Sequence, residues 1–347
     1  MRKSVLILVV IVAVFFAGCG VKPTAELWVL NMADGISGDV LLDFERERNA
    51  KVIYNTYETP DELYQILTEN PKKYDVVFAT NYITQRLRAE GAFAEIDKNK
   101  LENFKNIERD YLPSGALNIP YMTGTFGILY DENRAFTKID SWQSLWDNRY
   151  RNEIIMTPAR IPAISIAFKS LGYDINDTDQ RHIDEARIKL EEQYGIVQSY
   201  QTLNIAENMA WGRAILAAAT SNEAFMAIAK AKEMGYTNLK YIIPNEGSAR
   251  WIISMSIMKN SKNAELAMQF IDYMCDRDVS AKNSIATGLT SVIEGVRNSL
   301  PEDMKDSYVL YPSFAEIRKC IFWKFDINAN PKYETMWRVI KANIWMK

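Results

Sequence analysis

The sequence is poor in the residues that most metal and covalent chemistries require. Its 347 residues include one histidine, His182, and three cysteines. A site with several histidine ligands cannot be built, and any Ser-His-Asp or Cys-His machinery would have to use His182. Neither sign of charge dominates, since 41 Lys and Arg residues against 44 Asp and Glu residues give a formal net charge of −3. This balance disfavours a nucleic-acid partner, because no excess of positive charge is present to neutralise phosphates.

The sequence also lacks the short motifs that mark common enzyme sites. It has no G-x-G-x-x-G, no G-x-x-x-x-G-K-[ST], no G-x-S-x-G and no cysteine pair at metal-ligand spacing. We therefore expect no enzyme activity, no catalytic residue, no cofactor and no metal site. A hydrolase with paired carboxylates stays open as an alternative, because acidic residues are abundant.

Long apolar runs are absent beyond the first nineteen residues. There, a basic start precedes an uncharged stretch from 4 to 16, and two small residues stand directly before Cys19. The stretch is too short to span a bilayer comfortably, and its flanks are typical of an export signal. It resembles a bacterial lipoprotein signal, in which residues 1–18 are removed and Cys19 carries the lipid; the alternative is an uncleaved anchor or an ordinary cleavable signal. We expect a location in the cell envelope, on the periplasmic or extracellular face.

Export affects how the two remaining cysteines are interpreted. An oxidising compartment would permit a disulfide between Cys275 and Cys320, but the sequence contains no information on the distance between them. We expect two buried free thiols that act as small apolar side chains.

Strand-like and helix-like segments alternate along the rest of the chain. Strands are predicted at 25–31, 51–57 and 74–78, each followed by a helix, and this βαβαβα order implies a parallel sheet covered on both faces. Later strands are predicted at 153–156, 215–219, 239–243 and 251–258, and later helices at 141–146, 163–171, 179–194, from 261, at 314–320 and at 333–346. The pattern is that of an α/β protein.

The middle of the chain is less regular. The segment 117–130 predicts one or two strands broken at Gly124 and Gly127. No long linker separates the two α/β halves, so we expect the chain to cross between them more than once. A cleft between two such halves is a natural site for a small molecule.

Several segments occur in a recognisable order, among them LWVLNMADGI, KKYDVVFATNYITQRL, IPYMTGTFGILYDEN and YIIPNEGSARWIISMSIM. This order resembles the spermidine/putrescine-binding proteins of bacterial ABC importers over nearly the whole chain after the leader. The resemblance implies a two-lobed periplasmic-binding-protein fold, type II-like, in which each lobe is a mixed sheet flanked by helices and the cleft lies between the lobes. It also implies lobe 1 at 26–125 plus 253–298 and lobe 2 at 126–252 plus 299–347.

The resemblance implies a ligand site as well. Its candidate ligand-binding residues are Met32, Asp34, Thr80, Tyr82, Thr220, Trp251 and Trp323. Tyr82 and Trp251 match aromatic pocket residues of the family, and Trp323 falls close to a position that is usually polar. Met32 and Thr220 stand where the family has Trp. Aromatic rings in such a site attract an ammonium group through their faces.

The acidic part of this implied site is largely missing. The family's ammonium-binding carboxylate positions hold Ala159, Pro162 and Ile253, all apolar, and only Asp34 matches an acidic residue. The neighbouring Arg160 has the wrong sign of charge. Because a buried ammonium without a carboxylate is costly, we expect a polyamine-type solute-binding protein whose ligand is a polyamine or a smaller, less cationic solute.

The expected partners follow from the same resemblance. They are a small-molecule ligand, the permease subunits of an ABC importer, and a membrane reached through the lipid on Cys19, while the protein itself is expected to be a monomer. The alternative is a surface interaction lipoprotein that keeps the scaffold but has lost transport. A closed, well-shaped pocket would argue against that alternative.

Overall fold

The computed structural model of the protein describes residues 25–113 and 115–345. The predicted signal at 1–18 and the lipidation site Cys19 lie outside the described residues. Within them, no helix combines the length and apolar character needed to cross a membrane. The same part of the chain contains no group of three or more His, Cys, Asp or Glu side chains that could hold a metal ion.

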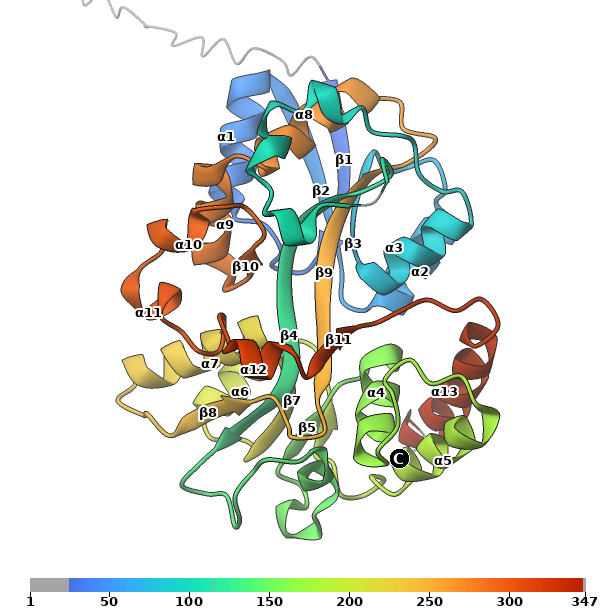
Figure 1. The fold of residues 1–347 in the computed structure, drawn as a ribbon, viewed down its shortest axis with the longest axis vertical. Coiled ribbons are helices and arrows are strands. Elements are labelled where there is room, and N and C mark those ends of the chain that lie inside the picture. The colour runs from blue at the N-terminus through green and yellow to red at the C-terminus, as the bar shows by residue number, and fades with distance from the viewer. Residues whose placement is uncertain (1–24, 114, 346–347) are drawn as a thin grey trace, which may run out of the picture.

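The first part of the chain builds parallel strands covered by helices, drawn in blue and cyan in Figure 1. These elements are β1 (Ala25–Met32), α1 (Gly38–Arg48), β2 (Ala50–Tyr57), α2 (Pro60–Glu69), β3 (Val76–Thr80) and α3 (Asn81–Ala89). Strand β1 lies between β2 and β3 and pairs in parallel with both. The predicted βαβαβα order is therefore confirmed, and we call β1, β2 and β3 the first half-sheet.

Local sequence signals explain how two of these elements form. Helix α2 begins after Thr59, whose side chain accepts a hydrogen bond from the Glu62 amide at 3.2 Å, and Pro60 occupies the first turn, where its missing N–H is not needed. Strand β3 is apolar and buried on both faces, as expected for a parallel strand between helical layers.

Two long strands join the first half-sheet to the rest of the molecule, and both run through its middle in Figure 1. They are β4 (Ile119–Asp131) and β9 (Ser248–Ile257), which pair antiparallel with each other. Strand β9 also pairs antiparallel with β3, and β4 pairs antiparallel with β7 (Leu216–Thr220). The sheet is therefore continuous and mixed, in the order β2-β1-β3-β9-β4-β7-β5-β6.

The second half-sheet consists of β5, β6 and β7, which are parallel to one another. Its elements and covering helices are β5 (Ile154–Met156), α4 (Arg160–Ser170), α5 (Gln180–Glu191), β6 (Ser199–Tyr200), α6 (Ile205–Ala210), α7 (Ser221–Glu233), β8 (Leu239–Ile242) and α13 (Asn330–Trp345). Helices α5 and α13 pack on α4 and on each other, and β8 pairs with the far end of β4.

The remaining elements lie between α7 and α13 in the chain or form short turns. They are α8 (Ala264–Met274), α9 (Arg277–Thr287), β10 (Thr290–Ser291), α10 (Val296–Ser299), α11 (Glu302–Lys305), α12 (Phe314–Ile317) and β11 (Cys320–Phe322), with 3-10 turns at Lys98–Lys100, Glu102–Asn106, Arg109–Tyr111, Trp142–Trp146 and Asn148–Tyr150. Strand β10 pairs with β4, and β11 pairs in parallel with β9.

The breaks predicted in the middle of the chain are wrong, because β4 is one continuous strand. Its glycines serve close packing instead. A Cβ on Gly124 would lie 2.4 Å from Cζ2 of Trp251, and a Cβ on Gly127 would lie 2.2 Å from the carbonyl oxygen of Ile242. These two positions lack a side chain because neighbouring groups lie directly on the strand.

Two further expectations need correction. The helix predicted at 314–320 ends at Ile317, and Cys320 begins β11, where it takes part in a parallel ladder with β9. The sheet as a whole is mixed and not parallel, since β9 runs antiparallel to both β3 and β4. The local pattern of 251–258 identified a strand but contained no information about its direction.

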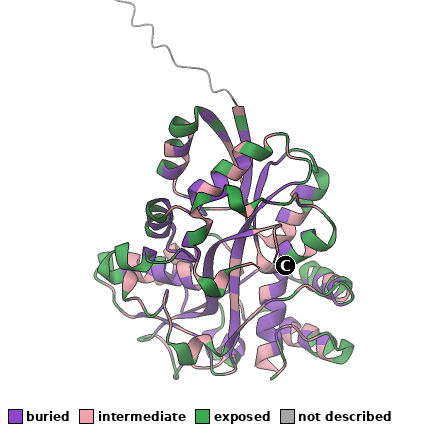
Figure 2. Cartoon of the chain, turned by 45° about the horizontal axis from the view of Figure 1, so that its top comes forward, coloured by how far each residue is buried: buried purple, intermediate pink, exposed green. Residues whose placement is uncertain are grey.

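Buried residues occupy the strands and the inner faces of the helices, while exposed residues lie on the outer helical faces (Figure 2). Cys275 and Cys320 are both free and buried, which confirms the expected free thiols. Burial raises the pKa of the Cys320 thiol to about 12, and it raises that of Cys275 further. His182 lies in α5, with Nδ1 2.8 Å from an Asp177 carboxylate oxygen and its ring stacked on Tyr173.

Candidate ligand-binding cleft

The carboxyl ends of both sets of parallel strands face one cavity. From the first half-sheet, the segments that follow β1, β2 and β3 line it, and from the second half-sheet the segments that follow β5, β6 and β7 do so. Ligands of α/β proteins bind at this end of parallel strands. The cavity has a volume of about 570 Å³. That volume lies within the roughly 300–1,000 Å³ that is typical of small-molecule sites.

The cavity brings together every residue that the sequence proposed for a ligand site. Its lining includes Met32, Asp34, Thr80, Tyr82, Thr220, Trp251 and Trp323. It also includes Ala159, Pro162 and Ile253, which stand at the expected carboxylate positions and are apolar here. The ligand-binding role of the seven residues stays a prediction.

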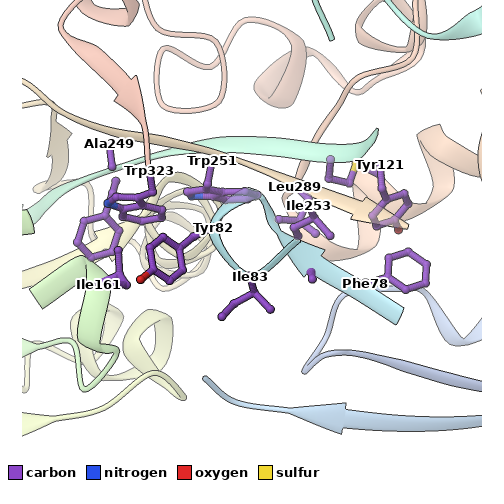
Figure 3. Close-up of a cluster of buried hydrophobic side chains, with 14 of the residues drawn as sticks. Phe78, Tyr82, Ile83, Tyr121, Ile161, Ala249, Trp251, Ile253, Leu289 and Trp323 are labelled. Carbon is purple, nitrogen blue, oxygen red and sulfur yellow. The ribbon is translucent and has the colours of Figure 1, made fainter. Parts of the chain in front are cut away.

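Three of the aromatic side chains in the lining lie near one another, and Figure 3 draws them as one group. Trp251 is 3% exposed, lies against Gly124 of β4, and its Nε1 has no hydrogen-bond acceptor among the described residues. Trp323 donates from Nε1 to the Ser165 hydroxyl at 2.8 Å. The two indoles therefore differ, because only Trp251 retains a free N–H group that a ligand oxygen can accept.

The third aromatic side chain, Tyr82, connects two parts of the fold. Its hydroxyl donates to Oδ1 of Asn330 in α13 at 2.7 Å, and its ring meets Phe325 edge-on with 5.6 Å between centroids. Burial raises the pKa of Tyr82 to about 12, so the hydroxyl stays protonated. Nearby, Asn81 donates to the carbonyl oxygen of Trp323 at 2.5 Å and so holds the segment after β11 against α3.

The first half-sheet supplies three carboxylates to the cavity, those of Asp34, Glu58 and Asp61. Asp34 follows β1 with a backbone φ of 55°, and Glu58 follows β2 directly. In 25–113 and 115–345, neither carboxylate has an ion pair or hydrogen bond to another side chain or to an amide. Asp61, by contrast, is paired with Arg160.

The second half-sheet supplies carboxylates that are already engaged. Glu207 forms an ion pair with Lys230 at 2.9 Å. Glu223 accepts hydrogen bonds from the Thr220 amide at 2.7 Å and the Thr220 hydroxyl at 2.6 Å, which caps α7. Burial raises the pKa of Glu223, and these two hydrogen bonds oppose that rise. These groups stabilise the second half of the site rather than offering charge to a ligand.

Arg160 is the one cationic side chain in the described lining of the cavity, and it is only 2% exposed. Its Nη2 and Nε lie 2.8 Å and 3.2 Å from the Asp61 carboxylate, and its Nη1 donates to Asn330 Oδ1 at 3.0 Å. Burial lowers the pKa of Arg160, but the hydrogen bonds and charge of Asp61, together with the nearby Tyr82 and Glu334, raise its pKa overall. The positive charge of Arg160, which is unfavourable for binding an ammonium group, is therefore neutralised by Asp61 inside the site.

Glu58 and Asp61 were not identified from the sequence as site residues, and Asp61 was not identified as the partner of Arg160. The signal for the first two was present, because both follow β2, and the carboxyl ends of neighbouring parallel strands share an edge of the sheet. The partner of Arg160 had no local signal, since Asp61 lies 99 positions away in the chain.

Two further polar atoms lining the cavity lack a hydrogen-bond partner in the described part of the chain. They are Nε2 of Gln201, a donor, and Oδ1 of Asn222, an acceptor, and both are buried. Buried polar groups are nearly always hydrogen-bonded. Together with Nε1 of Trp251, they mark places where a bound molecule would make hydrogen bonds.

Two α/β halves, joined by β4 and β9 and enclosing a cavity at the carboxyl ends of their parallel strands, define a two-lobed binding protein of the periplasmic type. The particular family follows from the sequence match: the chain belongs to the bacterial extracellular solute-binding proteins, whose family model matches residues 72–320.

Relatives and solved structures agree with this family. The spermidine/putrescine-binding periplasmic protein of Salmonella typhimurium is 29% identical over 324 residues, 91% of each chain. The putrescine-binding periplasmic protein SpuD of Pseudomonas aeruginosa is 27% identical over 304 residues, 78% of this chain and 82% of the relative. A solved protein of Listeria monocytogenes, provisionally described as a spermidine/putrescine ABC transporter, has a TM-score of 0.86 at 25% identity and covers 91% of this chain and 98% of its own.

Proposed function

We propose that this protein is the extracytoplasmic solute-binding subunit of an ABC importer and that its ligand is a small organic amine. The observation that carries the proposal is the pair of unpaired carboxylates, Asp34 and Glu58, in the same cavity as Tyr82 and Trp251. Carboxylates replace the hydration of an ammonium group, and aromatic faces attract it. Relatives named for spermidine and putrescine support the same class of ligand.

The affinity for polyamines is reduced relative to these relatives. Ala159, Pro162 and Ile253 are apolar, and Arg160, between the first two in the chain, places a cation in the same part of the lining. A spermidine molecule would have to bury ammonium groups without a counter-ion there, which is unfavourable. The ligand is therefore smaller or less cationic than spermidine.

The remaining parts of the proposal concern how the protein is mounted and how it moves. Residues 1–18 are a lipoprotein signal, and Cys19 anchors the protein to a membrane of the cell envelope as a monomer. Lobe 1 comprises 26–125 plus 253–298, and lobe 2 comprises 126–252 plus 299–347, so that β4 and β9 contribute to both. Hinge closure of the lobes around the ligand presents the closed form to the permease subunits.

A surface interaction lipoprotein without transport is not favoured. Such a protein needs no defined internal site, whereas this chain keeps a cavity of about 570 Å³ with unpaired acceptors and donors in its wall. The relatives are likewise binding proteins and not enzymes by name.

Isothermal titration calorimetry of the chain from residue 20 onward tests the proposal. The titrants are spermidine, putrescine, and primary amines that carry one ammonium group, with glutamate and maltose as controls. We expect heat and saturation with at least one amine and none with the controls. Submicromolar binding of spermidine would overturn the reduced polyamine affinity, and no binding of any amine would overturn the amine ligand.

A further inference from the structure

Arg160 and Asp61 meet across the cavity from opposite half-sheets. Asp61 lies in the first turn of α2, after β2, and Arg160 is the first residue of α4, after β5. The contact uses two guanidinium nitrogens on one carboxylate, with the nearest pair of atoms 2.8 Å apart. The Arg160 side chain is 2% exposed and that of Asp61 is 33% exposed. This is the planar, two-point geometry in which arginine binds carboxylates most specifically.

The pair changes the number of charges available to a ligand. Of the carboxylates in the described lining, Asp61, Glu207 and Glu223 are engaged with Arg160, Lys230 and Thr220. The two that remain, Asp34 and Glu58, both belong to the first half-sheet. An ammonium group on that side finds an acceptor, whereas a second ammonium directed at α4 meets a guanidinium instead.

The unpaired polar atoms favour a neutral group on the far side of the ligand. Nε1 of Trp251 and Nε2 of Gln201 are donors, and an ammonium group, which only donates, cannot satisfy them. A carbonyl oxygen can accept from either. Oδ1 of Asn222 is an acceptor and can receive an amide N–H.

We propose that Arg160 is a built-in cation that makes the cleft selective for ligands with one ammonium group at one end and a neutral hydrogen-bonding group, such as an amide, at the other. In this arrangement Arg160 takes the place of the second ammonium of a diamine by neutralising Asp61. The inference rests on the proposed amine-binding function and specifies its ligand class. It makes Arg160 a residue that determines specificity through repulsion of a wrong ligand as well as attraction of the right one.

The experiment compares two probes that differ in one charge. Putrescine carries two ammonium groups, and N-acetylputrescine carries one ammonium and one amide on the same four-carbon stem. Calorimetry with the chain from residue 20 onward is expected to give an affinity for N-acetylputrescine at least about tenfold above that for putrescine, the scale of one unfavourable charge contact.

Variants at the pair assign the selectivity to Arg160. In Arg160→Gln, Asp61 is released to bind a second ammonium, so the ratio of the two affinities should shift towards putrescine by roughly tenfold or more. Arg160→Lys is the matched control that keeps the positive charge, and it should keep the preference for N-acetylputrescine. Asp61→Asn is a second variant for the case that Arg160→Gln does not fold. It should strengthen discrimination against putrescine, because the cation then keeps only its longer contact with Glu334, at 3.8 Å.

The outcomes are distinct. Equal or tighter binding of putrescine by the wild-type protein would overturn the inference and leave the amine-binding function standing. An unchanged affinity ratio in Arg160→Gln would overturn it too, as would loss of the preference in Arg160→Lys. If Arg160→Gln does not fold, Asp61→Asn decides: a putrescine affinity equal to or higher than that of the wild-type protein would overturn the inference. Absence of binding to both probes would overturn the inference, and the amine-binding function would fall with it only if none of the other amines in the titration series binds.

Discussion

The two walls of the cavity use their charged residues differently. The wall from the first half-sheet presents Asp34 and Glu58, which have no partner in the described part of the chain. The wall from the second half-sheet holds Glu207, Glu223 and Arg160 in contacts within the protein. One wall can therefore bind a cation, and the other contributes shape, hydrogen-bonding groups and a cation of its own. The difference indicates a ligand that is itself asymmetric.

The backbone explains why both walls are nevertheless parts of one site. Each set of parallel strands directs its carboxyl ends to the same cavity, and β4 and β9 hold the two sets together. Because the chain crosses through paired strands rather than a flexible linker, the two walls face each other across the cavity. Substitutions on each wall test the contrast.

The largest expected effect comes from removing the free carboxylates of the first wall. Asp34→Asn combined with Glu58→Gln should weaken amine binding by roughly 100-fold or more, because hydrogen bonds to charged groups contribute about 1.5–3 kcal/mol each. Glu207→Gln on the second wall should cost much less, since its charge is already paired with Lys230. Calorimetric titration of the three proteins with one amine measures both. Equal losses on the two walls would remove the contrast.

A second prediction concerns the strand that both walls share. Gly124→Ala places a methyl group 2.4 Å from Trp251, so the indole must move. We expect a loss of about 1–3 kcal/mol in the free energy of unfolding, as in other overpacked cores, together with weaker ligand binding. Gly38→Ala, whose Cβ would meet no atom within 4 Å, is the matched control for the unfolding measurement. Urea denaturation and calorimetry provide the two measurements, and wild-type values for Gly124→Ala would contradict the packing described for β4.

A smaller effect is expected at a contact between the walls. Tyr82→Phe removes the hydrogen bond to Asn330 and should cost about 1 kcal/mol of the contact that holds α3 to α13. Small-angle X-ray scattering of the ligand-free protein should then show a larger radius of gyration. Tyr64→Phe is the control, because Tyr64 bonds Glu90 within the first part of the fold. A similar expansion in both variants would show that the Tyr82 contact has no special role in closure.

The smallest expected effect is a difference in reactivity between the two buried thiols, Cys275 and Cys320. Burial raises the pKa of both Cys275 and Cys320, so little thiolate exists near neutral pH, and reaction of the native protein with a thiol reagent should be slow for both. Cys320 lies in the three-residue strand β11 and should react first. Mass spectrometry of Cys19→Ser protein after timed labelling measures the order. Faster labelling of Cys275 would indicate that the first part opens more readily than β11.

Much of the fold could be predicted from the sequence because it depends on local patterns. The alternation of apolar strands with capped helices predicted the first half-sheet, and the order of segments indicated two lobes and the mixed sheet. The candidate site residues came from the same order, and all seven line the cavity. The glycines of β4 were misread as breaks, because Trp251 and Ile242, which lie against them, are more than a hundred positions away.

Most of the elements, the family, and the apolar residues Ala159, Pro162 and Ile253 at the expected carboxylate positions could be inferred from residue identity along the chain. The distribution of charge in the cleft could not, because it depends on contacts between distant segments. Arg160 looked like an unexplained cation until the fold placed Asp61 within 2.8 Å of it. The physical reason is that electrostatic pairing depends on distance and burial, which strands from both halves of the chain set together.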